Sequence, residues 1–314
     1  MSNPALAPVN LARLACPDCR DAVTRTGDSL VCARGHRYDI KGDVPVLLTT
    51  ATSNAIEADR SVAENVRLRR SLGRNKTLLR VVEALRPPHP FKYMRWRKNR
   101  PLRELFSNVV ARNNPPPDAL FLDIGSGILG GQNASGLSSF IRERVVALEI
   151  DAASGVGVVG DAHSLPWRDG VADGVLIQGV LEHVRNPERV ASEIFRVLKP
   201  GAPVYADVPF QQHYHLDPLD FRRWTSYGFN DLFSAFENVD SGACAGPAAA
   251  LTDMLTEFPA VLFARPAAYW LAKSVAGWIF SPVQLLDFFW SARPRAHTIA
   301  GAVYFLGVKP KRTG

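Results

Sequence analysis

Short apolar runs alternate with helical patterns from Asp118 to the end of the chain. An apolar run of four to eight residues between turn-forming residues is typical of a buried strand. Seven runs are predicted as strands, at 119–124, 145–150, 156–160, 173–178, 203–208, 238–243 and 300–308. A helix is predicted over 187–198, because Asn186 suits an N-cap, Pro187 suits the first helical position and Pro200-Gly201 stops a helix. Strands that alternate with helices predict an α/β domain with a mostly parallel sheet.

The polar pattern divides the chain into three predicted regions. Residues 1–52 are predicted as a small, cysteine-bearing, zinc-ribbon-like module that closes with an apolar run at 44–48. Residues 53–117 are polar, with helical patches, and read as a basic helical linker that ends at Pro115-Pro116-Pro117. Residues 118–314 hold the α/β domain, with a helical insertion at about 247–297 before the last strand.

The first predicted strand of the domain ends in a glycine-rich turn, Gly125-Ser126-Gly127-Ile-Leu-Gly130, and the second carries Glu149 near its end. Glycines let the backbone approach a nucleotide-type cofactor, and the acid can receive ribose hydroxyls. This G-x-G-x-x-G spacing also fits an NAD-dependent dehydrogenase. Asp123, two residues before the first glycine, argues against a dinucleotide site, as do the segments Asp161–Trp167 and Gln178–Val184 farther along the chain.

Together these segments, with Arg196–Gly201, resemble the class I S-adenosylmethionine-dependent methyltransferases (type 11-like domain) over roughly 118–240 and the last strand. The resemblance implies a Rossmann-like seven-stranded sheet whose last strand is antiparallel. It also implies cofactor contacts. Along the methionine part would lie Asp123, Gly125, Ser126, Gly127 and Gln178; at the ribose, Glu149 with Ile150; and beside the adenine, Asp161 and Ala162. Asp151 competes with Glu149 for the hydroxyls.

Four residues near the N-terminus have metal-ligand spacing: Cys16, Cys19, Cys32 and His36. A C-x2-C pair and a C-x3-H pair can close a tetrahedral zinc site, which helps a module too small to be held by its core. The alternatives are a stray cysteine pair and a redox C-x-x-C motif. Residues 14–48 resemble the zinc-binding segment of bacterial large-subunit rRNA guanine methyltransferases, which implies the same four ligands.

The loop after the fifth predicted strand carries candidate acceptor-side groups, His213, His215 and Asp220. It resembles a loop of a large methyltransferase subgroup, and these residues are candidate bases or acceptor contacts. Asp220 could instead pair with Arg223 to fix the loop. The three histidines, His183 included, also raise the question of a second metal, although no ligand spacing repeats.

The insertion at 247–297 is apolar and aromatic, and its longest uncharged run is 13 residues (Ser274–Leu286). Crossing a bilayer takes about 18 or more. A helical lid is expected, serving an apolar acceptor or contact with a membrane surface; extra core is the alternative. The segment 60–112 carries 15 Lys/Arg against three acids and suits RNA, anionic lipid or a solvated linker.

The sequence therefore predicts an S-adenosylmethionine-dependent methyltransferase with zinc, acting on a small-molecule, lipid-linked or glycan-type acceptor. The alternatives are an RNA (rRNA) methyltransferase and a non-catalytic binding or partner subunit. Residues 1–10 show no secretory signal and only four cysteines occur, which favours the cytoplasm, with peripheral contact to a membrane as a further expectation.

Overall fold

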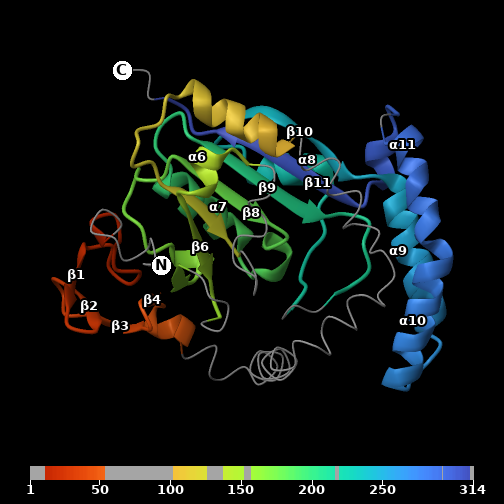
Figure 1. Ribbon diagram of the computed structural model, residues 1–314, viewed down its shortest axis with the longest axis horizontal. Coiled ribbons are helices and arrows are strands. Elements are labelled where there is room, and N and C mark those ends of the chain that lie inside the picture. Colours follow the sequence, from red (N-terminus) through yellow and green to blue (C-terminus); the bar gives the residue numbers. More distant parts are fainter. Residues whose placement is uncertain are drawn as a thin grey trace.

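The computed structural model describes residues 11–53, 102–125, 137–151, 157–215, 219–291 and 293–311. These residues build one eleven-stranded sheet with helices packed around it (Figure 1). The strands are β1 (Val23–Thr26), β2 (Ser29–Cys32), β3 (Arg37–Lys41), β4 (Val44–Leu47), β5 (Phe121–Ile124), β6 (Val145–Glu149), β7 (Val158–Gly160), β8 (Gly174–Gln178), β9 (Pro203–Pro209), β10 (Glu237–Ala245) and β11 (Ala302–Val308). Their order in the sheet is β1-β2-β3-β4-β7-β6-β5-β8-β9-β11-β10.

The helices cover the sheet and extend beyond one of its ends. Helical residues follow β4 at 50–53, and a helix at residues 102–112 precedes β5. The others are α6 (Ser139–Arg142), η4 (Ala162–Ser164), η5 (Leu181–His183), α7 (Pro187–Val197), α8 (Ser226–Leu232), α9 (Pro247–Ala260), α10 (Pro266–Phe280), η6 (Ser281–Leu286), α11 (Asp287–Trp290) and η7 (Ala296–Ile299). None of these described helices has both the length and the apolar character needed to cross a bilayer.

All seven predicted strands are confirmed as β5–β11. Strands β7, β6, β5, β8 and β9 run parallel, and β11 is antiparallel to both β9 and β10, as expected for the last strand. The predicted helix is confirmed as α7, where the Asn186 side chain accepts a hydrogen bond from the Arg189 amide. The local pattern therefore predicted both the buried apolar strands and the helix whose N-terminus has a clear capping residue.

The sheet has eleven strands rather than the seven expected. Strand β4 pairs in parallel with β7 through Val46 opposite Val159 and Leu47 opposite Gly160, so β1–β4 extend the sheet. Without β4, strand β7 would present an unpaired edge, which folded proteins avoid. Apolar side chains of the first module and of the α/β sheet, including Leu14, Leu47 and Trp167, share one buried cluster.

Helices α9–α11 lie in the stretch predicted as a helical insertion, and they stand beside the end of the sheet away from β1–β4 (Figure 1). Its fold is held by a buried acid. The carboxylate oxygens of Asp287 in α11 accept hydrogen bonds from the amides of Ala248 and Ala249 in the first turn of α9, both at 2.9 Å. An acid at a helix N-terminus satisfies amides that have no partner within the helix.

Candidate cofactor and acceptor site

The predicted cofactor residues meet at one edge of the sheet. Asp123, Glu149 and Gln178 lie at or near the carboxyl ends of β5, β6 and β8, which are neighbouring parallel strands. Ligands of open α/β sheets bind outside this edge. Ser126 and Gly127 lie outside the described residues.

Asp123 is a buried carboxylate that accepts no hydrogen bond from any described residue. Its side chain is 1% exposed, and neither oxygen has a hydrogen-bond partner among the described residues. Burial raises the pKa of Asp123 to about 7; the nearby Arg103 opposes the rise and Glu149 adds to it. A ligand that brings a cationic or hydrogen-bond-donating group would satisfy this carboxylate, so the site fits the amino-acid part of S-adenosylmethionine.

Gly125 makes the close turn that follows Asp123. Its φ is +69°, and a Cβ placed there would lie 2.3 Å from Cγ2 of Val180. Its amide donates to the carbonyl of Leu148 on β6 at 2.8 Å. Any larger residue would face both backbone strain and a collision, so the position requires glycine.

Glu149, the candidate for the ribose, and Asp161, the candidate for the adenine, differ in the number of hydrogen bonds that fix their carboxylates. Glu149 accepts a hydrogen bond from the amide of its neighbour Ile150 at 2.8 Å. Asp161 accepts from the His163 amide at 2.8 Å and from the Thr52 hydroxyl at 2.7 Å. Burial opposes ionisation of Asp161, but the hydrogen bonds from His163 and Thr52 outweigh it and lower the pKa. The neighbouring Ala162 is buried.

A buried network fixes the amide of Gln178. Its oxygen accepts from Arg103 at 3.2 Å, and its nitrogen donates to Asp207 at 2.7 Å. The hydroxyl of Tyr205 also donates to Asp207, at 3.2 Å. Sequence analysis missed Arg103 and Asp207; the signal for Asp207 is a single acid within the apolar strand β9, which seldom occurs without a partner. Nothing in the sequence indicated that Thr52 would donate a hydrogen bond to Asp161.

His213 links the acceptor loop to the insertion. Its Nδ1 lies 2.7 Å from a carboxylate oxygen of Asp253, and its Nε2 lies 3.1 Å from Glu257. Both acids belong to α9, where residues four apart share one face. Glu257 also accepts a hydrogen bond from the Tyr269 hydroxyl at 2.7 Å and pairs with Lys273, both on α10. The i, i+4 acids in an otherwise apolar segment were an available signal for this contact.

His215 and Asp220 lie together on the same loop. The carboxylate of Asp220 pairs with the guanidinium of Arg223 and accepts from the His215 amide at 2.8 Å. Burial opposes ionisation of Asp220, yet Arg223 outweighs it and lowers the pKa, while burial lowers the pKa of His215. The geometry agrees with the alternative in which Asp220 fixes the loop. Catalytic roles for His213, His215 and Asp220 stay predictions.

The four predicted metal ligands converge between β1–β3 and the preceding turn. Sγ of Cys16 and Sγ of Cys32 each lie 3.4 Å from Nδ1 of His36, and Sγ of Cys19 lies 3.7 Å from that of Cys32. Ligands of one tetrahedral zinc ion, at about 2.3 Å for sulfur and about 2.0 Å for nitrogen, are separated by roughly 3.5–3.8 Å. The arrangement could therefore hold zinc without rebuilding.

Comparisons with known proteins find similarity in the part of the chain that forms this edge of the sheet. Residues 122–206 match a family model described as a methyltransferase domain. Norajmaline N-methyltransferase of Rauvolfia serpentina is 34% identical over 113 residues, which is 32% of this chain and 38% of that protein. The chain thus spans well under half the length of this curated relative.

Solved structures with a similar arrangement include the cyclase SpnF, at 19% identity and a TM-score of 0.42 over 67% of this chain and 81% of that one. Another is a phosphoethanolamine N-methyltransferase of Haemonchus contortus, at 18% identity and a TM-score of 0.39 over 66% and 53%. The matched stretch 122–206 contains Asp123, Glu149 and Gln178. Residues 122–206 are therefore similar to a methyltransferase domain, and this stretch forms the edge of the sheet where the predicted cofactor residues lie.

Proposed function

We propose that this protein transfers a methyl group from S-adenosylmethionine to a small-molecule, lipid-linked or glycan-type acceptor. The observation that carries the proposal is the buried carboxylate of Asp123 at the carboxyl end of β5, which has no hydrogen-bond partner among the described residues. Asp123 and Gln178 would hold the methionine part, Glu149 the ribose, and Asp161 with Ala162 the adenine. The sulfonium of the bound cofactor supplies an activated methyl group, so the protein's main task is to orient the acceptor.

The acceptor class is supported by the contact between loop and insertion. His213 joins the loop after β9 to two acids of α9, so the apolar helices are fixed to the segment that would face the acceptor. Aromatic residues of the same two helices, such as Phe258 of α9 and Trp270 of α10, are exposed. A surface of this kind beside an acceptor pocket suits a molecule with an apolar portion.

The test has two stages. Calorimetry should show that the protein binds S-adenosylmethionine and that Asp123→Asn weakens binding at least tenfold. Methyl-labelled cofactor should then label the lipid or small-molecule fraction of a cell extract. Label in the RNA fraction would support RNA methylation instead. Binding without any turnover would support a non-catalytic subunit, and absence of binding would overturn the proposal.

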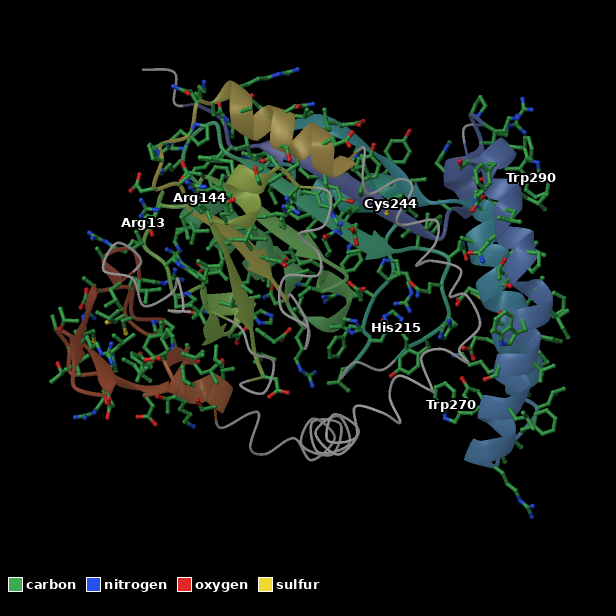
Figure 2. The ribbon with its side chains drawn as sticks, in the orientation of Figure 1. Arg13, Arg144, His215, Cys244, Trp270 and Trp290 are labelled. Carbon is green, nitrogen blue, oxygen red and sulfur yellow. The ribbon has the colours of Figure 1, made fainter. Side chains whose placement is uncertain are left out.

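We infer that α9–α11 also contact the surface of an anionic membrane. The acids of this insertion, Asp253, Glu257 and Asp287, are all buried, whereas Arg265, Arg293 and Arg295 are exposed. Figure 2 labels Trp270 and Trp290 toward opposite ends of the helical column. Exposed tryptophans combined with cations and without exposed acids are typical of helices that lie in a lipid interface.

Vesicle sedimentation tests this contact. Phosphatidylcholine vesicles with about 30% phosphatidylglycerol should retain the protein more strongly than pure phosphatidylcholine vesicles, because the cations add to apolar insertion. The double variant Trp270→Ala/Trp278→Ala should lose most retention. Tyr227→Ala, which removes an exposed aromatic residue from α8, is the matched control. Equal partitioning of all variants, or none by the unaltered protein, would overturn the inference.

Zinc binding by Cys16, Cys19, Cys32 and His36 is a further part of the proposal, supported by the separations of their ligand atoms. Elemental analysis of purified protein should find about one zinc per chain, reduced by Cys19→Ser.

The second candidate function, RNA methylation, is favoured by the basic stretch 60–112, most of which lies outside the described residues. Binding to generic RNA that falls steeply with salt would support it.

A further inference from the structure

A second cluster of groups that could hold a metal ion lies between the segment after β8 and the loop after β9. Glu182 and His183 belong to η5, which follows β8, and His215 belongs to the loop after β9. One potential ligand atom from each residue lies within 4.8 Å of the others. Figure 2 shows His215 between the sheet and the column of α9 and α10. The cluster is separate from the four cysteine and histidine ligands of the first module.

The imidazole of His183 is oriented as a metal-binding histidine is. Its Nδ1 lies 2.6 Å from the carbonyl oxygen of Leu219, so in the neutral ring this nitrogen carries the proton and donates it. The lone pair of the ring then belongs to Nε2. That atom lies 3.9 Å from a carboxylate oxygen of Glu182. A hydrogen bond from the distal nitrogen to a carbonyl is the usual support for a histidine ligand.

His215 has similar support from a carboxylate. Its Nδ1 lies 3.4 Å from Asp220 and 3.5 Å from the carbonyl oxygen of His213. A guanidinium nitrogen of Arg223 also lies 3.5 Å from Nδ1. Nδ1 is thus engaged by groups of its own loop, which leaves Nε2 as the ring nitrogen for a metal ion. Arg223 fixes Asp220 in turn. The rings of His183 and His215 meet edge to face, with centroids 5.1 Å apart.

The side chain of Glu182 supplies a negative charge to the same position. It is 3% exposed, compared with 13% for His183 and 29% for His215. The cluster is therefore shielded from solvent at Glu182 and accessible to solvent at His215. Ligand atoms bound to one ion at about 2.1 Å lie at most about 4.2 Å apart, so the three residues need to move less than about an ångström.

We propose that Glu182, His183 and His215 bind a divalent first-row transition metal ion whose open positions take an oxygen atom of the methyl acceptor. Two imidazoles and one carboxylate suit ions such as Zn²⁺, Mn²⁺ or Fe²⁺. Three protein ligands leave coordination positions for a further molecule, as in catalytic rather than structural sites. The part concerning the acceptor rests on the proposed methyl transfer.

The ion would activate a hydroxyl acceptor. Coordination lowers the pKa of a bound hydroxyl, so its proton passes to water and the oxygen keeps the electron pair. That pair forms the new oxygen–carbon bond with the methyl group, while the sulfur–carbon bond breaks and its electrons return to sulfur as a neutral thioether. No oxidant or further reactant is needed. The proposal thus narrows the acceptor to one that methylates on oxygen.

Manganese provides the test, because thiolate ligands bind Mn²⁺ poorly and oxygen and imidazole ligands accept it. Titration of zinc-replete protein with Mn²⁺, followed by electron paramagnetic resonance, should show about one bound ion per chain. Pulsed measurements should show coupling to imidazole nitrogen. Glu182→Gln and His215→Gln should each weaken Mn²⁺ binding at least tenfold. His297→Gln, which changes an exposed histidine of η7, should leave it unchanged.

Three outcomes would overturn the proposal: no Mn²⁺ bound by the unaltered protein, equal binding by it and by both site variants, or absence of coupling to imidazole nitrogen. The third outcome is informative even if a variant fails to fold. Thermal unfolding checks the fold of each variant. Calorimetry with S-adenosylmethionine separates the two claims, because cofactor binding without manganese binding removes the metal site and leaves the proposed function standing.

Discussion

At the scale of single residues, the feature that most strongly defines this site is a buried carboxylate with no hydrogen-bond partner in the described part of the chain. Asp123 stays buried at the end of β5 although ionising there is costly, which raises its pKa to about 7. Such strain is typical of a group whose partner arrives with a ligand. The adjacent turn at Gly125 brings the backbone close to the same position.

Asp123→Asn should change how stability depends on pH. Because the pKa of Asp123 is raised in the folded state, its stabilising contribution is present below about pH 4 and is lost as pH rises to about 7. Three pKa units correspond to roughly 4 kcal/mol. The stability of Asp123→Asn relative to unaltered protein should therefore increase by up to that amount between pH 4 and 8. Denaturant unfolding of cofactor-free protein at both pH values measures it.

The affinity of the unaltered protein for S-adenosylmethionine should rise with pH, whereas the stability that Asp123 contributes falls. The cationic group of the cofactor favours the ionised carboxylate, so the affinity of unaltered protein should rise by up to about tenfold per pH unit below pH 7. Asp123→Asn should bind weakly without this dependence. If both proteins gave parallel affinity curves, Asp123 would not be the group that receives the cofactor.

Gly125→Ala should abolish cofactor binding through a collision as well as backbone strain. The new methyl would meet Val180 at 2.3 Å, and φ at this position is +69°. Gly170 has a φ of +62° with open space around it, so Gly170→Ala isolates the strain alone. We expect a loss of about 1 kcal/mol for Gly170→Ala and about 3 kcal/mol or more for Gly125→Ala. Denaturant unfolding and calorimetry compare them; equal losses would contradict the collision.

The sequence could predict the residues that lie in local motifs, but not those that reach the site from elsewhere. Asp123 and Gly125 follow a readable strand, and the resemblance placed Asp161 and Gln178. Thr52, which donates to Asp161, is 109 positions away in the sequence and is a common surface residue type. Arg103 reaches Gln178 from the helix before β5. Contacts of this kind depend on the finished fold, which no local pattern records.

At the scale of elements, the helices α9–α11 were predicted from the sequence, but the contacts that hold them were not. The spacing of Asp253 and Glu257 indicated a shared helix face, and only the structure shows that His213 is their partner. Asp287 likewise becomes the cap of α9 only when α11 folds back. Gly246 leaves room for it, since a Cβ there would lie 2.2 Å from the Asp287 carboxylate.

Asp287→Ala should loosen the insertion. The substitution removes the acceptor of two amides in the first turn of α9 and leaves them buried, so the free energy of unfolding should fall by roughly 3 kcal/mol. Hydrogen exchange should accelerate first at Ala248 and Ala249. Asp231→Ala, at an exposed acid on α8, should change stability by less than about 0.5 kcal/mol. Unchanged exchange in α9 would show that the cap is dispensable.

At the scale of the whole molecule, the first module and the α/β sheet form one body. The sequence indicated separate regions because it could not show that β4 pairs with β7. This pairing involves only two residues of each strand, and neither strand's local pattern identifies its partner. The joint is reinforced where Arg20 of the module and Arg196 of α7 share the carboxylate of Glu193, with nitrogen–oxygen distances of 2.8 Å. Cys16 also lies in the core cluster that contains Trp167.

If the four ligands hold zinc as proposed, its removal should destabilise the entire chain and not the module alone. Cys19→Ser, or a chelator, should lower the melting temperature by at least about 5 °C in a single transition, because the core is continuous across the two parts. It should also weaken cofactor binding, since Thr52 at the end of the module donates to Asp161. Calorimetric scans test this, with Arg34→Ala, an exposed neighbour of the cysteines, as the control that keeps zinc and melts normally. Two transitions, with the upper one and the cofactor affinity unchanged, would mean that the module folds independently and that β4 only rests against the edge of the sheet.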